Sequence, residues 1–193
     1  MPDTAPPVES APQVDLSRYT PGDFHPGRGK LTQVAWYFCS LALVECRWLP
    51  FSSVRCAVLR WFGARIGHGV RIKPRVRIKF PWRLSVGDYT WIGEDAWIDN
   101  LADVQIGSHA CVSQGAYLCT GSHDARSTGF ELITKPITLA DGAWVAARAV
   151  VLPGVELGPN AMAAAGSVVT KSVPAGVIVG GNPARPLGER SPS

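Results

Sequence analysis

The stretch LADGAWVAARAVVLPGVELGPNAMAAAGSVV, residues 139–169, places an aliphatic side chain at every sixth position. These positions are Leu139, Val145, Val151, Leu157, Ala163 and Val169. Four residues after each of them the side chain is small or β-branched. An extended strand repeats every two residues and a helix every 3.6, so neither element explains a rule of six. The stretch therefore predicts a β-solenoid in which three short strands make one coil.

The same rule holds from Ile66 onward. Its earlier positions are Ile66, Ile72, Ile78, Val86, Ile92, Ile98, Ile106, Val112 and Leu118. Fourteen of the fifteen positions are Ile, Leu or Val, whereas chance would give roughly three. Two-residue slips after 83 and 103 are interpreted as corner bulges, and Gly, Asn or Asp is expected at the tight turns. The five predicted coils are 66–83, 86–103, 106–123, 139–156 and 157–174.

Other segments flank this solenoid. Residues at the N-terminus are rich in Pro, Ser and Asp and show no period, which predicts a mobile arm. A helical pattern follows in two pieces broken at Pro50, with Ser52 or Ser53 as the candidate cap of the second. The predicted division is a mobile arm at 1–30, a helical cap at 31–64, the β-helix at 65–187 and a tail at 188–193.

Two interpretations of the helical segment stay open. A solenoid end needs covering, so the helices suit a cap that packs on the body of the protein. Arginines lie near the tryptophans of this segment, which also suits an amphipathic face in peripheral contact with a membrane. The longest apolar run, residues 34–44, is too short to span a bilayer.

Composition narrows the functional classes. Apolar residues make up 46% of the 193 residues, and 20 Gly with 16 Pro favour a turn-rich fold. The net charge of +4 suits an anionic small molecule or a membrane surface, and no basic run interleaved with aromatics indicates nucleic acid. Five cysteines without a CxxC pair indicate free thiols in a reducing compartment. Since no signal-peptide pattern opens the chain, a cytoplasmic protein is expected.

The repeat is interrupted after GAYLCTGSHD, residues 115–124. The third coil is expected to close at His123, and residues 124–138 then form an excursion loop beside it. An imidazole suits removal of a hydroxyl proton near neutral pH, although a lone histidine can also be a solvated corner residue. Cys119 raises a Cys–His nucleophile, but it is interpreted as packing because one strand cannot easily turn both groups together.

Several segments resemble one protein family. FGARIGHGVRI, PWRLSVGDYTWIG, SQGAYLCTGSHD and VGGNPARPL are similar, in order and spacing, to the colanic acid biosynthesis acetyltransferases. These are related to galactoside and maltose acetyltransferases, hexapeptide-repeat enzymes that fold as a left-handed parallel β-helix. The similarity covers residues 50–187. It implies an O-acetyltransferase that moves an acetyl group from acetyl coenzyme A to a sugar hydroxyl of a surface polysaccharide. The expected location is the cytoplasm or the inner face of its membrane.

The resemblance also implies roles for single residues. His123 is the expected general base, and a homotrimer with active sites between subunits is expected. The expected acceptor-binding residues are Asn100, Asp99 and Trp82, with a plain turn role for Asn100 equally open. Trp82, like Trp97, is expected to stack on a sugar ring, and packing between subunits is equally open for both. The expected contacts to acetyl coenzyme A are Ala147, Ala165, Gly166, Thr170, Lys171 and Arg185, with an ordinary surface role equally open for the last three. The Ala147 N–H is expected to stabilise the thioester oxygen as charge develops there.

Alternatives remain for the chemistry. A zinc site built from His68, His109 and His123 is one alternative, because solenoid carbonic anhydrases bind zinc through three histidines. Those enzymes carry an HxxxxH pair, whereas His109 and His123 are fourteen residues apart. No metal is therefore expected. Asp124 either orients the imidazole or begins the loop. A non-catalytic solenoid that serves as a scaffold or binding module is the alternative function. An amine or serine acceptor is a third interpretation, against which the short helical segment counts.

Overall fold

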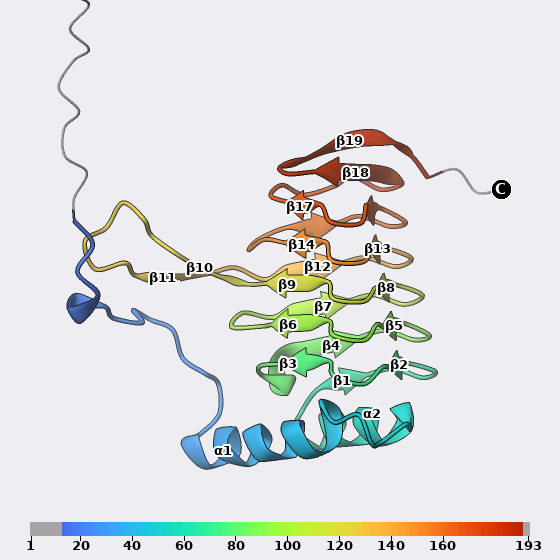
Figure 1. Ribbon diagram of the computed structural model, residues 1–193, viewed down its shortest axis with the longest axis horizontal. Coiled ribbons are helices and arrows are strands. Elements are labelled where there is room, and N and C mark those ends of the chain that lie inside the picture. Colours follow the sequence, from blue (N-terminus) through green and yellow to red (C-terminus); the bar gives the residue numbers. More distant parts are fainter. Residues whose placement is uncertain (1–12, 191–193) are drawn as a thin grey trace, which may run out of the picture.

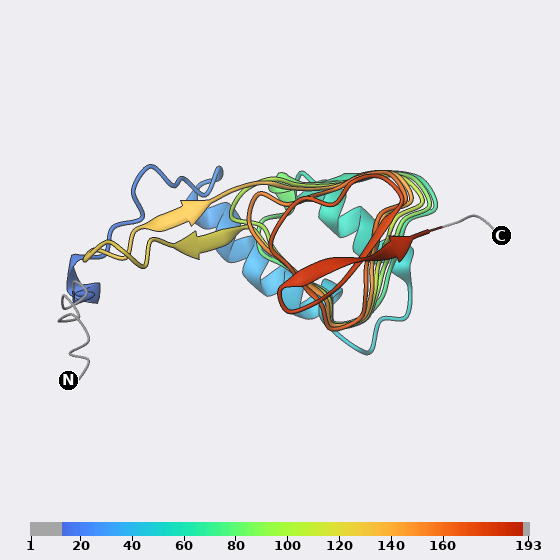
Figure 2. The ribbon, with the colours of Figure 1, turned by 90° about the horizontal axis from the view of Figure 1, so that it is seen from above.

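The computed structural model describes residues 13–190, whose strands build a triangular prism (Figures 1 and 2). Sheet A contains β1 (Arg65–Ile66), β4 (Leu84–Val86), β7 (Val104–Ile106), β12 (Ile137–Leu139) and β15 (Glu156–Leu157). Sheet B contains β2 (Arg71–Ile72), β5 (Trp91–Ile92), β8 (Cys111–Val112), β13 (Trp144–Val145), β16 (Met162–Ala163), β18 (Val177–Gly181) and β19 (Ala184–Glu189). Sheet C contains β3 (Arg77–Ile78), β6 (Trp97–Asp99), β9 (Tyr117–Cys119), β14 (Val150–Val151) and β17 (Val168–Val169).

The prism is a left-handed parallel β-helix, as predicted. Viewed from the C-terminal end, the chain runs clockwise while it rises toward the viewer, which defines the left hand (Figure 2). All neighbours within the three sheets pair in parallel except β18 and β19. The strand β18 adds part of a sixth turn above the five predicted coils.

The predicted aliphatic positions fill the prism. In sheet B, Ile72 is in register with Ile92, and Ile92 with Val112. These side chains are buried, and the columns of the other two sheets stack in the same way. Burial of one such side chain contributes about 1.5–3 kcal/mol, so the columns are the main source of stability. The period of six is therefore confirmed as the pattern that fills the core.

The corner between sheets B and C is built from residues in the left-handed region of the backbone. Five of them lie one above another at successive coils: Arg75, Asp95, Gly115, Arg148 and Gly166. A turn this tight requires a positive φ, which non-glycine residues adopt only at a cost. The first predicted slip, after residue 83, is a 3-10 turn at Pro81–Arg83.

The N-terminal end of the prism is covered by helices, which confirms the packing interpretation of the cap (Figure 1). These are α1 (Lys30–Cys39), a π turn (Ser40–Val44) and α2 (Ser52–Trp61). The Trp36 indole N–H donates to the Ile78 carbonyl at 3.0 Å. Ser52 is the first residue of α2 instead of its cap, because its hydroxyl accepts from the Ile72 N–H at 2.7 Å and ties the helix to β2.

The excursion from the prism is a β-hairpin, formed by β10 (Gly121–His123) and β11 (Leu132–Thr134). The chain leaves the coil at Gly121, three residues before the predicted start of the loop. It is back in sheet A by Ile137, which pairs with Val104. The hairpin projects away from the corner between sheets C and A (Figure 2).

The described part of the N-terminal arm, residues 13–29, lies along the hairpin and this corner (Figure 1). The Asp15 N–H donates to the Thr128 carbonyl at 2.9 Å, and the Trp82 indole donates to the Pro26 carbonyl at 2.7 Å. The first twelve residues of the predicted arm lie outside the described residues. At the other terminus, β19 extends to Glu189 and thus into the predicted tail, whose residues 191–193 also lie outside the described residues.

Candidate active site

His123 lies on the outgoing strand of the hairpin, not at a corner of the prism as expected. The displacement arises because residues 121–123 pair with β11 instead of turning into sheet A. The imidazole is exposed, and its Nδ1 lies 2.9 Å from the Phe130 carbonyl oxygen. The Phe130 ring stacks on it with centroids 4.3 Å apart and planes 5° apart. The Tyr19 ring of the arm lies 5.8 Å from it.

This hydrogen bond selects a tautomer. A carbonyl oxygen only accepts, so Nδ1 must carry a proton to make the bond. In the neutral ring Nε2 then holds the free lone pair. The imidazole is therefore arranged to accept a proton at Nε2 while Phe130 holds its plane.

The neighbours of His123 have structural roles. Asp124 accepts from the Arg126 N–H at 2.9 Å, and its own N–H donates to the Glu131 carbonyl, which supports the interpretation that it begins the loop. The Cys119 thiol donates to the Gly121 carbonyl at 3.1 Å, which supports a packing role. His109 stacks on Tyr89 with centroids 5.3 Å apart. Within residues 13–190, no three His, Cys, Asp or Glu side chains gather as a metal site.

A polar cluster lies on the outer face of sheet C, on the coil from which the hairpin departs and the two coils before it. The Tyr117 hydroxyl donates to Asp99 at 3.2 Å, and Lys79 Nζ lies 3.6 Å from the other carboxylate oxygen. Burial raises the pKa of the Tyr117 phenol, and the adjacent Cys119 and Asp99 raise this pKa further. Asp99, a predicted acceptor residue, is thus held in a network with a neutral phenol and an ammonium group.

The other two predicted acceptor residues are engaged within the chain. Asn100 is fully buried, donates to the Phe80 carbonyl at 2.6 Å and accepts from the Phe80 N–H at 2.9 Å. These bonds support the turn role of Asn100. Trp82 stacks on Phe80 at 5.2 Å and anchors the arm through Pro26, so its indole N–H is occupied.

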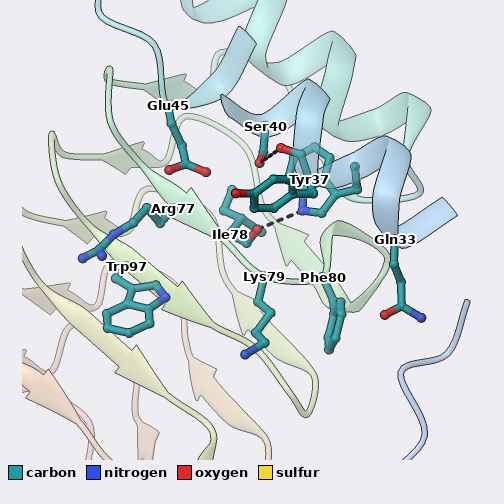
Figure 3. A pocket seen from close by; sticks show the side chains of 10 residues that line it. Gln33, Tyr37, Ser40, Glu45, Arg77, Ile78, Lys79, Phe80 and Trp97 are labelled. Atoms are coloured by element: carbon teal, nitrogen blue, oxygen red, sulfur yellow. Dashed lines mark hydrogen bonds between the residues drawn. The ribbon is translucent and has the colours of Figure 1, made fainter. Parts of the chain in front are cut away.

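A pocket of about 300 Å³ opens between the cap and sheet C (Figure 3). From the cap come Tyr37 and Glu45, while Lys79 reaches in from the end of β3. Arg77 and Trp97 line it from sheet C, with the guanidinium 4.3 Å above the indole ring. Tyr37, Glu45, Arg77 and Lys79 were missed in the sequence, although Arg77 and Lys79 flank the column residue Ile78 and therefore face outward.

The predicted donor residues occupy three places. Ala147, Ala165 and Gly166 meet at the corner between sheets B and C, where the Gly166 N–H donates to the Ala147 carbonyl at 2.9 Å. A Cβ on Gly166 would meet no atom within 4 Å, so the outside of this corner is open. The other three are exposed elsewhere: Thr170 and Lys171 follow β17, and Arg185 lies on β19. The hairpin and the Ala147 corner therefore belong to different corners of the prism.

Known proteins are similar to this chain over most of its length. The Escherichia coli K12 protein with the provisional name colanic acid biosynthesis acetyltransferase WcaF is 40% identical over 182 residues, covering 91% of this chain and 97% of that protein. Galactoside O-acetyltransferase of the same organism is 28% identical over 139 residues, 70% of this chain and 68% of that relative.

The similarity extends to solved structures. A hexapeptide-repeat acetyltransferase of Vibrio cholerae O1 biovar eltor, solved in complex with acetyl coenzyme A, has a TM-score of 0.79 at 25% identity. The match covers 91% of this chain and 97% of that chain. No protein-family model matches the chain.

Proposed function

Because this chain belongs to the hexapeptide-repeat acyltransferase family, we propose that it transfers an acetyl group from acetyl coenzyme A to a sugar hydroxyl in surface polysaccharide biosynthesis. The relative that is 40% identical is named for colanic acid biosynthesis, and the solved relative holds acetyl coenzyme A. Within this chain, the observation that carries the proposal is the exposed His123 imidazole, with its Nδ1 bonded to the Phe130 carbonyl. The reaction would take place in the cytoplasm.

His123 acts as the general base. Its Nε2 accepts the hydroxyl proton of the sugar as the sugar oxygen forms a bond to the thioester carbonyl carbon. The Phe130 carbonyl stabilises the resulting imidazolium through the Nδ1–H bond. When the carbon–sulfur bond breaks, the imidazolium donates its proton to the departing thiolate. The products are the acetylated sugar and coenzyme A as the free thiol.

The donor corner has the properties required for a slender thioester. Acetyl coenzyme A supplies the acetyl group in activated form. Ala165 is exposed and Gly166 has no side chain, so a narrow arm can approach the backbone at this corner. Within residues 13–190 no acceptor pairs with the Ala147 N–H, which leaves it available for the developing oxyanion. Thr170, Lys171 and Arg185 would contact the nucleotide and its phosphates.

The acceptor would bind beside the outer face of sheet C. Asp99 offers carboxylate oxygens for sugar hydroxyls there, whereas the faces of the Trp97 ring are covered by the Arg77 guanidinium and the Tyr117 ring. The adjacent pocket supplies Lys79 and Arg77 for an anionic group on the acceptor. Trp82 would contribute through the face of its ring.

A single chain holds His123 and the donor corner apart, so we infer that the site forms between two subunits of a trimer. The hairpin projects from the prism (Figure 2), and in the trimer it would reach the donor corner of the neighbouring subunit. A closed ring of three copies gives three equivalent sites of this kind.

The first experiment measures thiol release from acetyl coenzyme A with a panel of sugars, sugar nucleotides and lipid-linked sugars. His123→Ala is expected to lower kcat at least ~100-fold, because the general base is lost. His109→Ala is the matched control, since that imidazole is also exposed but lies on Tyr89. Full turnover by His123→Ala, or no turnover by the wild-type chain with any acceptor, would contradict the mechanism and favour a binding module.

A second experiment tests the shared site. Ala165→Trp should block the donor corner, because a large side chain would occupy its open outer surface. Co-expression of His123→Ala with Ala165→Trp should restore about a quarter of the sites, since a random mixture pairs one intact hairpin with one intact corner at that frequency. Continued inactivity of the mixed trimers would place both groups in one subunit.

A further inference from the structure

The helical cap carries a surface that the proposed chemistry does not use, apart from Tyr37 at the edge of the acceptor pocket. We call it the cap face and define it by the large apolar side chains that the cap exposes: Leu31, Val34, Tyr37, Phe38, Leu41, Trp48, Phe51 and Trp61. Leu31 is 88% exposed, Phe38 63% and Trp61 80%. Large contiguous apolar patches are uncommon on water-exposed surfaces and mark sites of association.

The helix α1 and its π turn are apolar on two opposite sides. Trp36, Ser40 and Val44 are buried against the prism and recur every four residues. On the other side the outward positions are Leu31, Val34, Ala35, Phe38, Leu41 and Ala42. A helix that packs on a protein body and faces water normally carries polar residues on its outer side. The outer side of α1 is therefore suited to an apolar environment.

Both helices contribute to one surface. Trp61, at the end of α2, shares a hollow with Leu31 and Ala35 of α1, and Arg28 lines the same hollow. The two helices lie across one end of the prism, so their outer sides face away from the stacked coils (Figure 1). A surface of this kind can meet a flat partner without moving the hairpin.

The charges around the cap face are nearly all positive. Residues 28–65 contain six basic side chains and one acidic side chain, Glu45. Arg55 is buried and bonded to carbonyls of the connecting loop. The other five are exposed: Arg28, Lys30, Arg47, Arg60 and Arg65. None of these five forms an ion pair with an acidic group of residues 13–190. Apolar and aromatic side chains rimmed by cations are complementary to an anionic lipid surface.

We propose that the cap face docks this protein on the surface of an anionic lipid bilayer. The apolar side chains of α1 would enter the boundary between headgroups and acyl chains, with Trp48 and Trp61 at the level of the headgroups. None of the described helices is long and apolar enough to cross a membrane. The cap would therefore lie on the bilayer, with the prism directed away from it. This inference does not depend on acetyl transfer.

The test is co-sedimentation of the full chain with vesicles of phosphatidylglycerol and phosphatidylethanolamine, beside vesicles of phosphatidylcholine alone. We expect binding to the anionic vesicles that weakens as salt is raised. Phe38→Glu and Leu31→Glu should each weaken this binding at least tenfold without unfolding the protein, because both side chains are exposed. Leu187→Glu is the matched control, since Leu187 is 67% exposed on β19 at the other end of the prism.

Two results would overturn the proposal. One is equal vesicle binding by Phe38→Glu, Leu31→Glu and the wild-type chain, or no vesicle binding by any of them. The other is a smaller assembly mass for Phe38→Glu in analytical ultracentrifugation, which would make the cap face a contact between copies of this chain. Thiol release measured without vesicles is a separate readout, so failure of docking and failure of catalysis can be distinguished.

Discussion

Asn100 and His123 both follow strands of sheet C, yet the structure uses them in opposite ways. The Asn100 side-chain amide is buried. It donates one hydrogen bond to Phe80 of the coil below and accepts one from the same residue. In the exposed His123 ring, Nδ1 is hydrogen-bonded to the Phe130 carbonyl, and Nε2 is left free. A side chain whose polar atoms are all paired inside the chain can stabilise the fold but cannot also bind a ligand in the same state.

Replacement of Asn100 separates its two roles. Asn100→Ala would leave the buried Phe80 N–H without a partner, which costs about 1–3 kcal/mol, whereas the Phe80 carbonyl would still accept from the Arg83 N–H. We expect a lower urea midpoint with an unchanged KM for the sugar acceptor. Thr170→Ala serves as a control for the unfolding measurement, because Thr170 is exposed. A raised acceptor KM with wild-type stability would instead show that Asn100 binds the sugar.

At the scale of elements, the hairpin and the arm each place an aromatic ring beside the imidazole. Phe130 of the hairpin stacks on one face, and Tyr19 of the arm approaches the ring at an interplanar angle of 59°. The arm itself is held by the bond from Asp15 to the Thr128 carbonyl. Two segments distant in sequence, the arm and the hairpin, therefore restrict one side chain.

Tyr19→Ala should loosen the imidazole without loss of the hairpin. Since correct orientation of a catalytic base contributes to rate, we expect kcat to fall about 3- to 10-fold with little change in thermal stability. Leu16→Ala is the control, because Leu16 lies in the same arm and is 65% exposed. Equal rates for the two variants would assign Tyr19 no part in positioning His123.

Sequence periodicity predicted the coils well because each aliphatic column repeats one physical requirement at each turn. It did not place His123, because Gly121 and Ser122 carry no hydrophobic signal that distinguishes a corner from a paired strand. The outward ladder of Arg77, Trp97 and Tyr117 could be assigned only once the register of the coils was known. The contact between Tyr19 and His123 left no local pattern, since it depends on where a non-periodic arm lies.

At the scale of the whole molecule, the distance between coils is set where backbones approach most closely. A glycine follows the aliphatic residue of sheet A in four coils: Gly67, Gly87, Gly107 and Gly158. A Cβ on Gly107 would lie 2.7 Å from the Asp141 backbone nitrogen of the next coil. Such a contact cannot be relieved by a side-chain rotation, so the coils themselves would have to separate.

Gly107→Ala should therefore destabilise the entire prism. Overpacking of this kind costs about 1–3 kcal/mol, whereas alanine in place of glycine at an unstrained open site stabilises a protein by about 0.4–1 kcal/mol. Gly188→Ala supplies that comparison, because a Cβ at Gly188 would meet no atom within 4 Å. We expect opposite shifts of the urea midpoint for the two variants. Shifts of the same sign would mean that neighbouring coils are free to move apart at the glycine column, and that the register of the prism is held by the aliphatic columns alone.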